Sequence, residues 1–224
     1  MKKGLVLLIG LMFIFALTAC NNEDSEDEET NDTVIATVND EEIYESTWKK
    51  SVDRMMLSYQ QQGIDVESEQ GQMFVEQIET QALDQLINQT LLYQEAKADN
   101  LVVDETEAQA ELTEIKEGYD SDEEFATALE SNLFTEDELL ELLKIELSIT
   151  AYLDATLDEV TVTEEEKEAY YDDYKEEADD EEEIPPYEDV EENIEAQLIS
   201  QAEQAQVSEI ISTLKESSEI ENNL

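Results

Sequence analysis

The side chains of this 224-residue chain that could do chemistry are almost all carboxylates. The sequence holds 62 Asp and Glu against 11 Lys and Arg, with one cysteine and no histidine, and its formal net charge is −51. The lack of histidine excludes Ser-His and Cys-His nucleophiles, histidine proton shuttles and histidine metal sites. Two carboxylates can hydrolyse glycosides, but among 62 acids no pair stands out. We therefore expect no enzyme and no cofactor.

The densest acidic run, KEEADDEEEIPPYEDV at 175–190, places seven carboxylates in the eight positions from Glu176 to Glu183. Neighbouring carboxylates can gather Ca²⁺, but this run lacks the alternating spacing and the glycine of an EF-hand loop. We expect a solvated acidic loop, with weak calcium association as the alternative and no defined metal site. Nucleic acid is a poor partner for the whole chain, because phosphate binding needs clusters of Lys and Arg.

The first twenty residues predict export. An apolar run from Gly4 to Ala19 follows Lys2 and Lys3, and it is too short to prefer spanning a bilayer. The motif Leu17-Thr18-Ala19-Cys20 resembles the bacterial lipobox, in which the cysteine thiol is acylated and the signal is cut just before it. This resemblance implies a signal peptide over 1–19 and a lipid on Cys20 that anchors the protein at the extracytoplasmic face of the cell membrane. A plain secretion signal with an incidental cysteine is the alternative.

The lipid-bearing residue and the polar, acidic stretch after it, 20–33, predict a disordered tether. Beyond it, five Gly and two Pro among abundant Glu, Gln, Leu and Ala predict a mainly α-helical chain. Val34 to Trp48 reads as two short strands around a tight turn, followed by a helix. We predict helices over Ser46–Gln62, Gln72–Asn100, Glu105–Glu117, Asp122–Ser131, Glu136–Leu157, Glu164–Glu177 and Pro186–Glu216.

Four of these helix starts fit the capping box, in which the first side chain and the fourth each bond the other's backbone N–H. The four cap residues are Asp104, Ser121, Thr135 and Thr163. The second helix is apolar on more than one side, which predicts that it is central to the fold. The last helix carries Val190, Ile194, Leu198, Ile210, Ile211 and Leu214 at helical spacing. We expect all of them to enter the same core.

At DQLINQTLLYQEAKADNLVVDETE, 84–107, the chain resembles the SurA-like N-terminal chaperone domain that also occurs in PrsA-like foldase lipoproteins. TVNDEEI, 37–43, looks like the opening hairpin of that family, although a glycine is usual where Asp40 stands. The segments 125–147 and 160–174 look like its next helical segments, in the same order. The resemblance covers about 34–215.

This resemblance implies a helical chaperone body over 34–216, of the SurA N-terminal and trigger-factor C-terminal type, with a small N-terminal β-hairpin and a tail over 217–224. In the foldase relatives a parvulin-type prolyl isomerase domain precedes the final helix. Here the interval 176–185 is far shorter than the roughly 50 residues of a small domain, and the parvulin histidines have no counterpart. The interval therefore looks like a join where the isomerase domain would be inserted.

The function implied is a membrane-anchored holdase that shelters unfolded or partly folded secreted proteins without isomerising prolines. Our client-binding candidates are Met55, Met56, Tyr59, Met73 and Phe74, because flexible thioethers and aromatic rings adapt to varied surfaces. Ordinary core packing of the same residues is the alternative.

The basic cluster near Trp48 comprises Lys49, Lys50 and Arg54, and we expect these residues to pair within their helix with Glu45 and Asp53. Two other classes of function stay open. The chain could be a structural or assembly lipoprotein that binds one dedicated envelope partner, or it could be an isomerase.

Overall fold

The computed structural model describes residues 32–64, 66, 71–177 and 185–224. In this part of the chain the fold is mainly α-helical with a small antiparallel sheet, which confirms the predicted fold class. The helices are α1 (Glu45–Gln61), α2 (Gln72–Ala98), α3 (Glu105–Glu117), α4 (Asp122–Ser131), α5 (Glu136–Thr156), α6 (Glu164–Glu177) and α7 (Tyr187–Ser217). The strands are β1 (Val34–Val38), β2 (Glu41–Tyr44) and β3 (Ile220–Asn222).

The predicted helix starts are confirmed by their caps. Asp104, Ser121 and Thr135 each accept a hydrogen bond from the backbone N–H three residues later. Thr135 forms the complete capping box with Glu138, and Thr163 makes the same two-way exchange with Glu166. These contacts join residues three positions apart, so the local sequence is enough to specify them.

Helix α2 is the centre of the fold because it contributes to all three apolar clusters. Ile78 and Ala82 pack with Val52 of α1. Further along, Leu83 to Leu91 pack with the sheet, and Leu92 to Ala96 pack with α5. Neighbours on several sides explain why this helix is apolar on more than one side. Each Leu or Ile buried in this way contributes roughly 1.5–3 kcal/mol.

The sheet joins the two ends of the described chain. Its strand order is β2-β1-β3, and β1 pairs antiparallel with both neighbours. Asn39 takes a left-handed conformation in the β1–β2 turn, with φ of 55°. Its N–H donates to the Glu219 carbonyl at 2.7 Å, and its side-chain amide donates to Gln94 Oε1 at 2.6 Å. The third strand lies in the segment expected to be a tail, and its pairing was not predicted.

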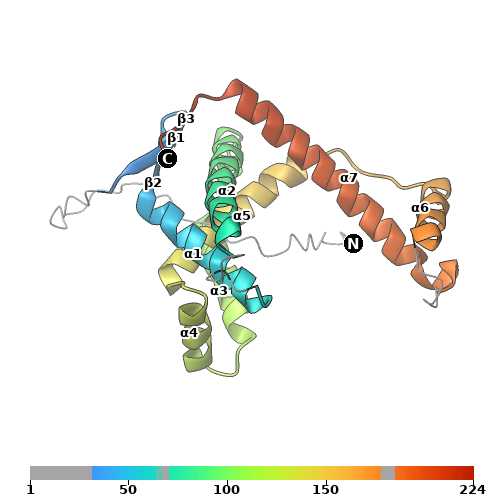
Figure 1. Cartoon of the computed structure of the whole chain (residues 1–224), viewed down its shortest axis with the longest axis horizontal. Coiled ribbons are helices and arrows are strands. Elements are labelled where there is room, and N and C mark those ends of the chain that lie inside the picture. Colours follow the sequence, from blue (N-terminus) through green and yellow to red (C-terminus); the bar gives the residue numbers. More distant parts are fainter. Residues whose placement is uncertain (1–31, 65, 67–70, 178–184) are drawn as a thin grey trace.

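The last helix is divided between two regions (Figure 1). Its C-terminal half packs Val207, Ile210, Ile211 and Leu214 against the cluster formed by α2 and α5. Its N-terminal half runs away from that cluster toward α6, as Figure 1 shows. We call α6, the connector 158–163 and residues 187–206 of α7 the arm, and the remaining described residues the body. The expectation that the whole last helix enters one core is thus met only by its second half.

Several predicted features lie outside the described residues. They are the signal peptide, Cys20, most of the acidic tether and positions 178–184 of the predicted join. Within the described residues no helix is both long and apolar enough to cross a membrane.

Candidate functional site

The client-binding candidates lie where α1 ends and α2 begins. Met55, Met56 and Tyr59 are half-buried, and all three pack against the cluster of Val52, Val66, Ile78 and Ala82. Phe74 is 47% exposed in the first turns of α2. Met73 belongs to the same helix by its backbone. We call Met55, Met56, Tyr59, Ile64 and Phe74 the α1–α2 tip; its role in binding stays a prediction.

The tip contains both side chains that pack against the core and side chains that are exposed to solvent. Ile64, in the loop after α1, is 38% exposed, and Phe74 is more exposed still. The three α1 residues, by contrast, help to cover a buried cluster, which fits the packing alternative as well as the binding one. Only the exposed residues can therefore be changed without disturbing the core.

The basic cluster of α1 crosses to another helix. Lys49 pairs with Glu45 at 2.7 Å, as predicted. Lys50 and Arg54 instead reach Glu138 of α5, at 2.5 and 3.3 Å, so Arg54 does not pair with Asp53 as expected.

Arg54 is the most deeply buried charge of the body, with 1% of its side chain exposed. Its Nε donates to the Leu133 carbonyl at 3.0 Å, and its guanidinium carbon lies 3.6 Å from the centroid of the Phe134 ring. Burial lowers the pKa of Arg54 to about 10, so it stays charged at neutral pH. Burial alone would raise the pKa of Glu138, but hydrogen bonds from Lys50 and the Thr135 N–H bring it below the ordinary value. This network fixes the start of α5 against α1.

A partly enclosed carboxylate lies between α2 and α5. Gln89 Nε2 donates to Glu146 Oε1 at 3.3 Å. Burial raises the pKa of Glu146, and the hydrogen bond from Gln89 opposes that change. The pair joins α2 to α5 within the body.

The arm is organised around Lys167. Its ammonium lies 2.9 Å from Glu164 on the same helix, and 2.5 and 3.5 Å from Glu191 and Glu195 on α7. Only 8% of this side chain is exposed. Hydrogen bonds to Glu164 and Glu191 raise the pKa of Lys167, which is therefore fully protonated at neutral pH. One lysine thus joins the two helices of the arm.

Tyrosines complete the contact between α6 and α7. Tyr171 donates its hydroxyl to the Pro185 carbonyl, and Tyr187 donates to Glu164, both at 2.6 Å. The two rings lie 5.3 Å apart between centroids. Nearer the body, Gln206 of α7 accepts from the Asp158 N–H at 2.8 Å and donates to the Asp158 carbonyl at 3.2 Å. Apart from the buried side chain of Ile194, the contacts that hold the arm together are polar.

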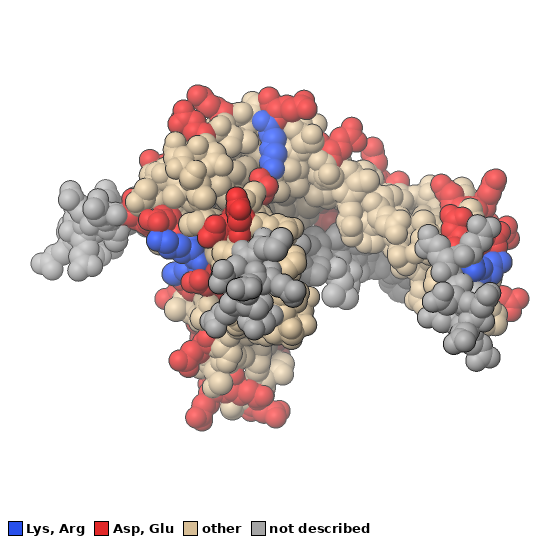
Figure 2. Space-filling model, viewed as in Figure 1, with Lys and Arg blue, Asp and Glu red and all other residues tan. Residues whose placement is uncertain are grey.

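Apolar side chains also line the arm between these polar contacts. Val160 and Val162 of the connector, and Leu198 and Ile199 of α7, are half-buried. None of the four belongs to a buried cluster of the described chain. We call these four residues the arm stripe. Figure 2 shows carboxylates gathered over α6 at one end of the molecule, over α4 at the bottom and along the upper edge, with uncharged surface over part of α7.

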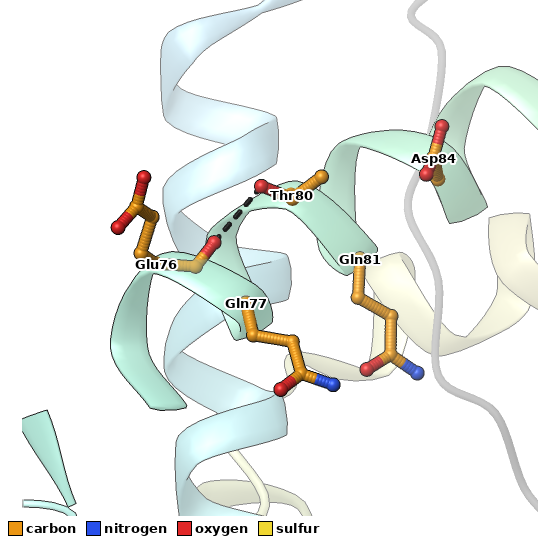
Figure 3. Close-up of a pocket in the computed structure, with 5 residues that line it drawn as sticks. All are labelled: Glu76, Gln77, Thr80, Gln81 and Asp84. Carbon is orange, nitrogen blue, oxygen red and sulfur yellow. Dashed lines mark hydrogen bonds between the residues drawn. The ribbon is translucent and has the colours of Figure 1, made fainter. Parts of the chain in front are cut away.

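A hollow of about 500 Å³ lies over the first half of α2 (Figure 3). It is lined by Glu76, Gln77, Thr80, Gln81 and Asp84. The Thr80 hydroxyl donates to the backbone carbonyl of Glu76 at 2.9 Å, so it has no activating base as a partner. Gln77 and Gln81 point to the same side of the helix in Figure 3. These neutral amides suit hydrogen bonding and do not form a catalytic group.

The described residues contain no group of three or more Asp, Glu or Cys placed to hold a metal ion. The run from Glu176 to Glu183 falls largely outside the described residues, so weak calcium association stays a prediction.

Comparison of the sequence with known proteins identifies a family for this chain. A sequence model of the SurA-like N-terminal domain matches residues 1–153. The chain belongs to this family. The match ends within α5, so the arm lies beyond it.

The particular relatives carry the name foldase protein PrsA. The protein of that name from Clostridium botulinum strain 657 is 32% identical over 180 residues, which cover 75% of this chain and 52% of the relative. The one from Clostridium kluyveri is 29% identical over 171 residues, with 70% and 50% covered. The chain thus spans about half the length of these relatives.

Sequence reasoning missed most of the arm. It found the helices, but it did not predict the lysine that joins them or the stripe beside them. One signal was available, since Lys167 is the only base between Glu164 and Glu168. A single cation among four glutamates is a natural centre for ion pairs.

Proposed function

We propose that the protein is a holdase chaperone of the cell surface, anchored by a lipid on Cys20, that binds unfolded secreted chains without isomerising prolines. The observation that carries the proposal is the arm. It projects from a well-packed body, it is held mainly by polar contacts, and it carries half-buried apolar side chains that belong to none of the three buried clusters. Family membership and the relatives' names support the same role.

Binding an unfolded chain needs apolar surface that can adapt, within a surface that stays soluble. The arm stripe and the exposed part of the α1–α2 tip offer such surface on two sides of the body. The carboxylates that gather over α6 and α4 (Figure 2), together with a net charge of −51, keep the molecule hydrated and discourage self-association. A client would be held by several weak contacts and released without a chemical step.

The lack of isomerase activity is proposed from the sequence between the two arm helices. Only nine residues separate Glu177 from Tyr187, whereas a folded domain needs roughly 50. A protease-coupled assay with a prolyl peptide should show no rate above background. A rate above background that survives purification would overturn this part of the proposal.

The central test is suppression of aggregation. Chemically unfolded client is diluted with or without the protein, and light scattering is followed over a range of salt concentrations. We expect the protein to lower scattering at substoichiometric to equimolar ratios. Failure to protect any client at any salt concentration would contradict the holdase proposal. A stable complex with one folded envelope protein, without such protection, would favour an assembly lipoprotein.

The tip can be tested with a matched pair of exposed residues. Phe74→Glu places a charge in the tip, and Val102→Glu places one in the loop between α2 and α3, where the side chain is 38% exposed. If the tip binds clients, only Phe74→Glu should weaken protection, while both variants keep wild-type melting temperatures. Equal protection by the two variants would remove the tip from the binding surface. Met55→Glu with Met56→Glu is a stronger change, to be interpreted only if the variant still folds.

The anchor has its own test. Mass spectrometry of the protein from membranes should find fatty acyl chains on Cys20 as the first residue, and Cys20→Ala should release the protein into the medium. An unmodified cysteine on a secreted protein would support the plain secretion signal instead.

A further inference from the structure

Helix α1 of the body and helix α6 of the arm differ in charge. Helix α1 carries three bases and two acids, whereas α6 carries eight acids and two lysines. Both lysines of α6 are already neutralised, Lys167 by three carboxylates and Lys175 by Asp172 at 2.6 Å. The charge that the arm presents to other molecules is therefore negative.

Several carboxylates of the arm are free to act on a partner. On α6 these are Glu165, Glu168 and Asp173, and on α7 they are Glu188, Asp189 and Glu192; all six are exposed and none forms an ion pair with a described residue. Among the described residues, eight of the nine Lys and Arg lie within 4 Å of a carboxylate. The described part of the chain thus has almost no basic side chain left to compete for these acids.

The arm also shows how a lysine can be held there. The Lys175 ammonium lies 4.7 Å from the centroid of the Tyr171 ring while it pairs with Asp172. A ring face and a carboxylate together form a favourable environment for a cation. Tyr174, 45% exposed, adds a second aromatic ring to the acidic surface of α6.

We propose that the arm binds unfolded client segments that are rich in lysine and arginine. This inference rests on the proposed holdase function and names the class of client. The aliphatic stems of the client's basic side chains lie on the arm stripe, and their charged heads reach the free carboxylates and Tyr174. Attraction between unlike charges also speeds the association of a basic client with the arm, and repulsion between like charges disfavours the binding of acidic chains.

The test uses three labelled peptides with the same apolar residues and the same length, in which the charged positions are all lysine, all glutamine or all glutamate. Binding to the full chain is measured by fluorescence anisotropy. The lysine peptide should bind roughly tenfold or more tightly than the glutamate peptide at low salt. The difference should shrink between about 50 and 500 mM NaCl, because screening shortens the range of these attractions to a few ångströms.

Two variants with equal changes in charge locate the effect. The arm variant carries Glu165→Gln, Glu168→Gln, Asp173→Asn, Glu188→Gln, Asp189→Asn and Glu192→Gln. The control carries Glu114→Gln, Glu117→Gln, Asp120→Asn, Glu123→Gln, Glu130→Gln and Asp137→Asn in the body, where all six side chains are exposed. The arm variant should lose most of the preference for lysine, and the control should keep it.

The outcomes separate this inference from the proposed function. Equal affinity for the three peptides overturns the inference, and so does an equal loss in the two variants, because the arm would then hold no special role. If the protein still suppresses aggregation of a client of near-zero net charge, the holdase proposal stands without the inference. If it protects no client at all, both fail.

Discussion

The body and the arm contain the same kinds of helix but are stabilised by different interactions. The body contains three buried apolar clusters, and α2 contributes to each of them. Among the described residues of the arm, only Ile194 and Lys167 are buried. Long helices with similar periodicity thus form a packed core in the body. In the arm they form a projecting pair of helices held together mainly by polar contacts.

The difference predicts different stabilities. Each buried aliphatic side chain of the body contributes roughly 1.5–3 kcal/mol, whereas an exposed ion pair contributes about 0.2–1 kcal/mol. Regions with few buried apolar contacts open locally at a small cost in free energy. The arm should therefore change its position while the body stays folded, which is what a surface for varied clients requires.

The largest effect is expected from matched isoleucines of the two regions. Ile145 of α5 is 1% exposed within the body, and Ile194 of α7 is 6% exposed within the arm. Ile145→Ala should lower the free energy of global unfolding by about 3 kcal/mol, because it leaves a cavity in a cluster. Ile194→Ala should lower it by less than about 1 kcal/mol, because the arm already opens before the body. Urea titration measures both values, and similar losses would show that the two regions unfold as one unit.

The buried arginine should give the next largest effect. Arg54→Met leaves the Leu133 carbonyl without its donor and removes one partner of Glu138, so we expect a loss of about 2 kcal/mol. Lys50→Met is the control, because Lys50 pairs with the same carboxylate from a side chain that is 54% exposed. It should cost no more than about 1 kcal/mol. If urea titration gave the same free energy of unfolding for Arg54→Met and Lys50→Met, the buried position of Arg54 would add nothing to stability.

A smaller and local effect is expected in the arm from Lys167→Met. Loss of the ammonium leaves Glu164, Glu191 and Glu195 facing one another without a cation. Hydrogen exchange followed by mass spectrometry should become faster in α6 and in the first turns of α7, with little change in α2 and α5. Unchanged exchange in α6 would mean that the tyrosine contacts alone hold the arm. High salt should reproduce part of the effect in the wild-type chain by screening the ion pairs.

The smallest effects should appear as opposite responses to pH. Hydrogen bonds from Lys167 and Tyr187 lower the pKa of Glu164 below its ordinary value of 4.5. Its stabilising contribution to the arm is therefore present above that value and is lost as the pH falls through the lowered pKa. Burial raises the pKa of Glu146, so its charged form destabilises the body as the pH rises above 4.5.

This contrast can be measured with one substitution. Glu146→Gln should raise the melting temperature at pH 7 and leave it nearly unchanged below pH 4.5, because the wild-type carboxyl is then protonated too. The rate of hydrogen exchange in α6, corrected for the pH dependence of intrinsic exchange, should increase as the pH is lowered. This should hold for both the wild-type protein and Glu146→Gln. A melting temperature that drops at pH 7 would show that the Glu146 carboxylate is stabilised by more than its hydrogen bond from Gln89.

The sequence predicted part of the candidate site. The sequence predicted that Met55, Met56 and Tyr59 belong to one helix, and the structure has them packed against one buried cluster. It did not distinguish them from Phe74, which is largely exposed. Apolar character is a property of the residue, whereas exposure depends on which other elements cover it.

The sequence by itself determined the helices, because their caps and periodicity involve residues only a few positions apart. Thr135 and Glu138 needed no distant partner to begin α5. Tertiary structure decided which of those helices share a core. Val190, Ile194 and Leu198 are at helical spacing, as are Ile210, Ile211 and Leu214, yet only the second set packs on α2 and α5.

The same reason explains the other differences. Arg54 pairs with Glu138, 84 positions away, instead of with the adjacent Asp53, and β3 pairs with β1 from the other end of the chain. Such contacts depend on how packed elements meet in space, since burial against distant partners stabilises one arrangement over others that the local pattern equally allows.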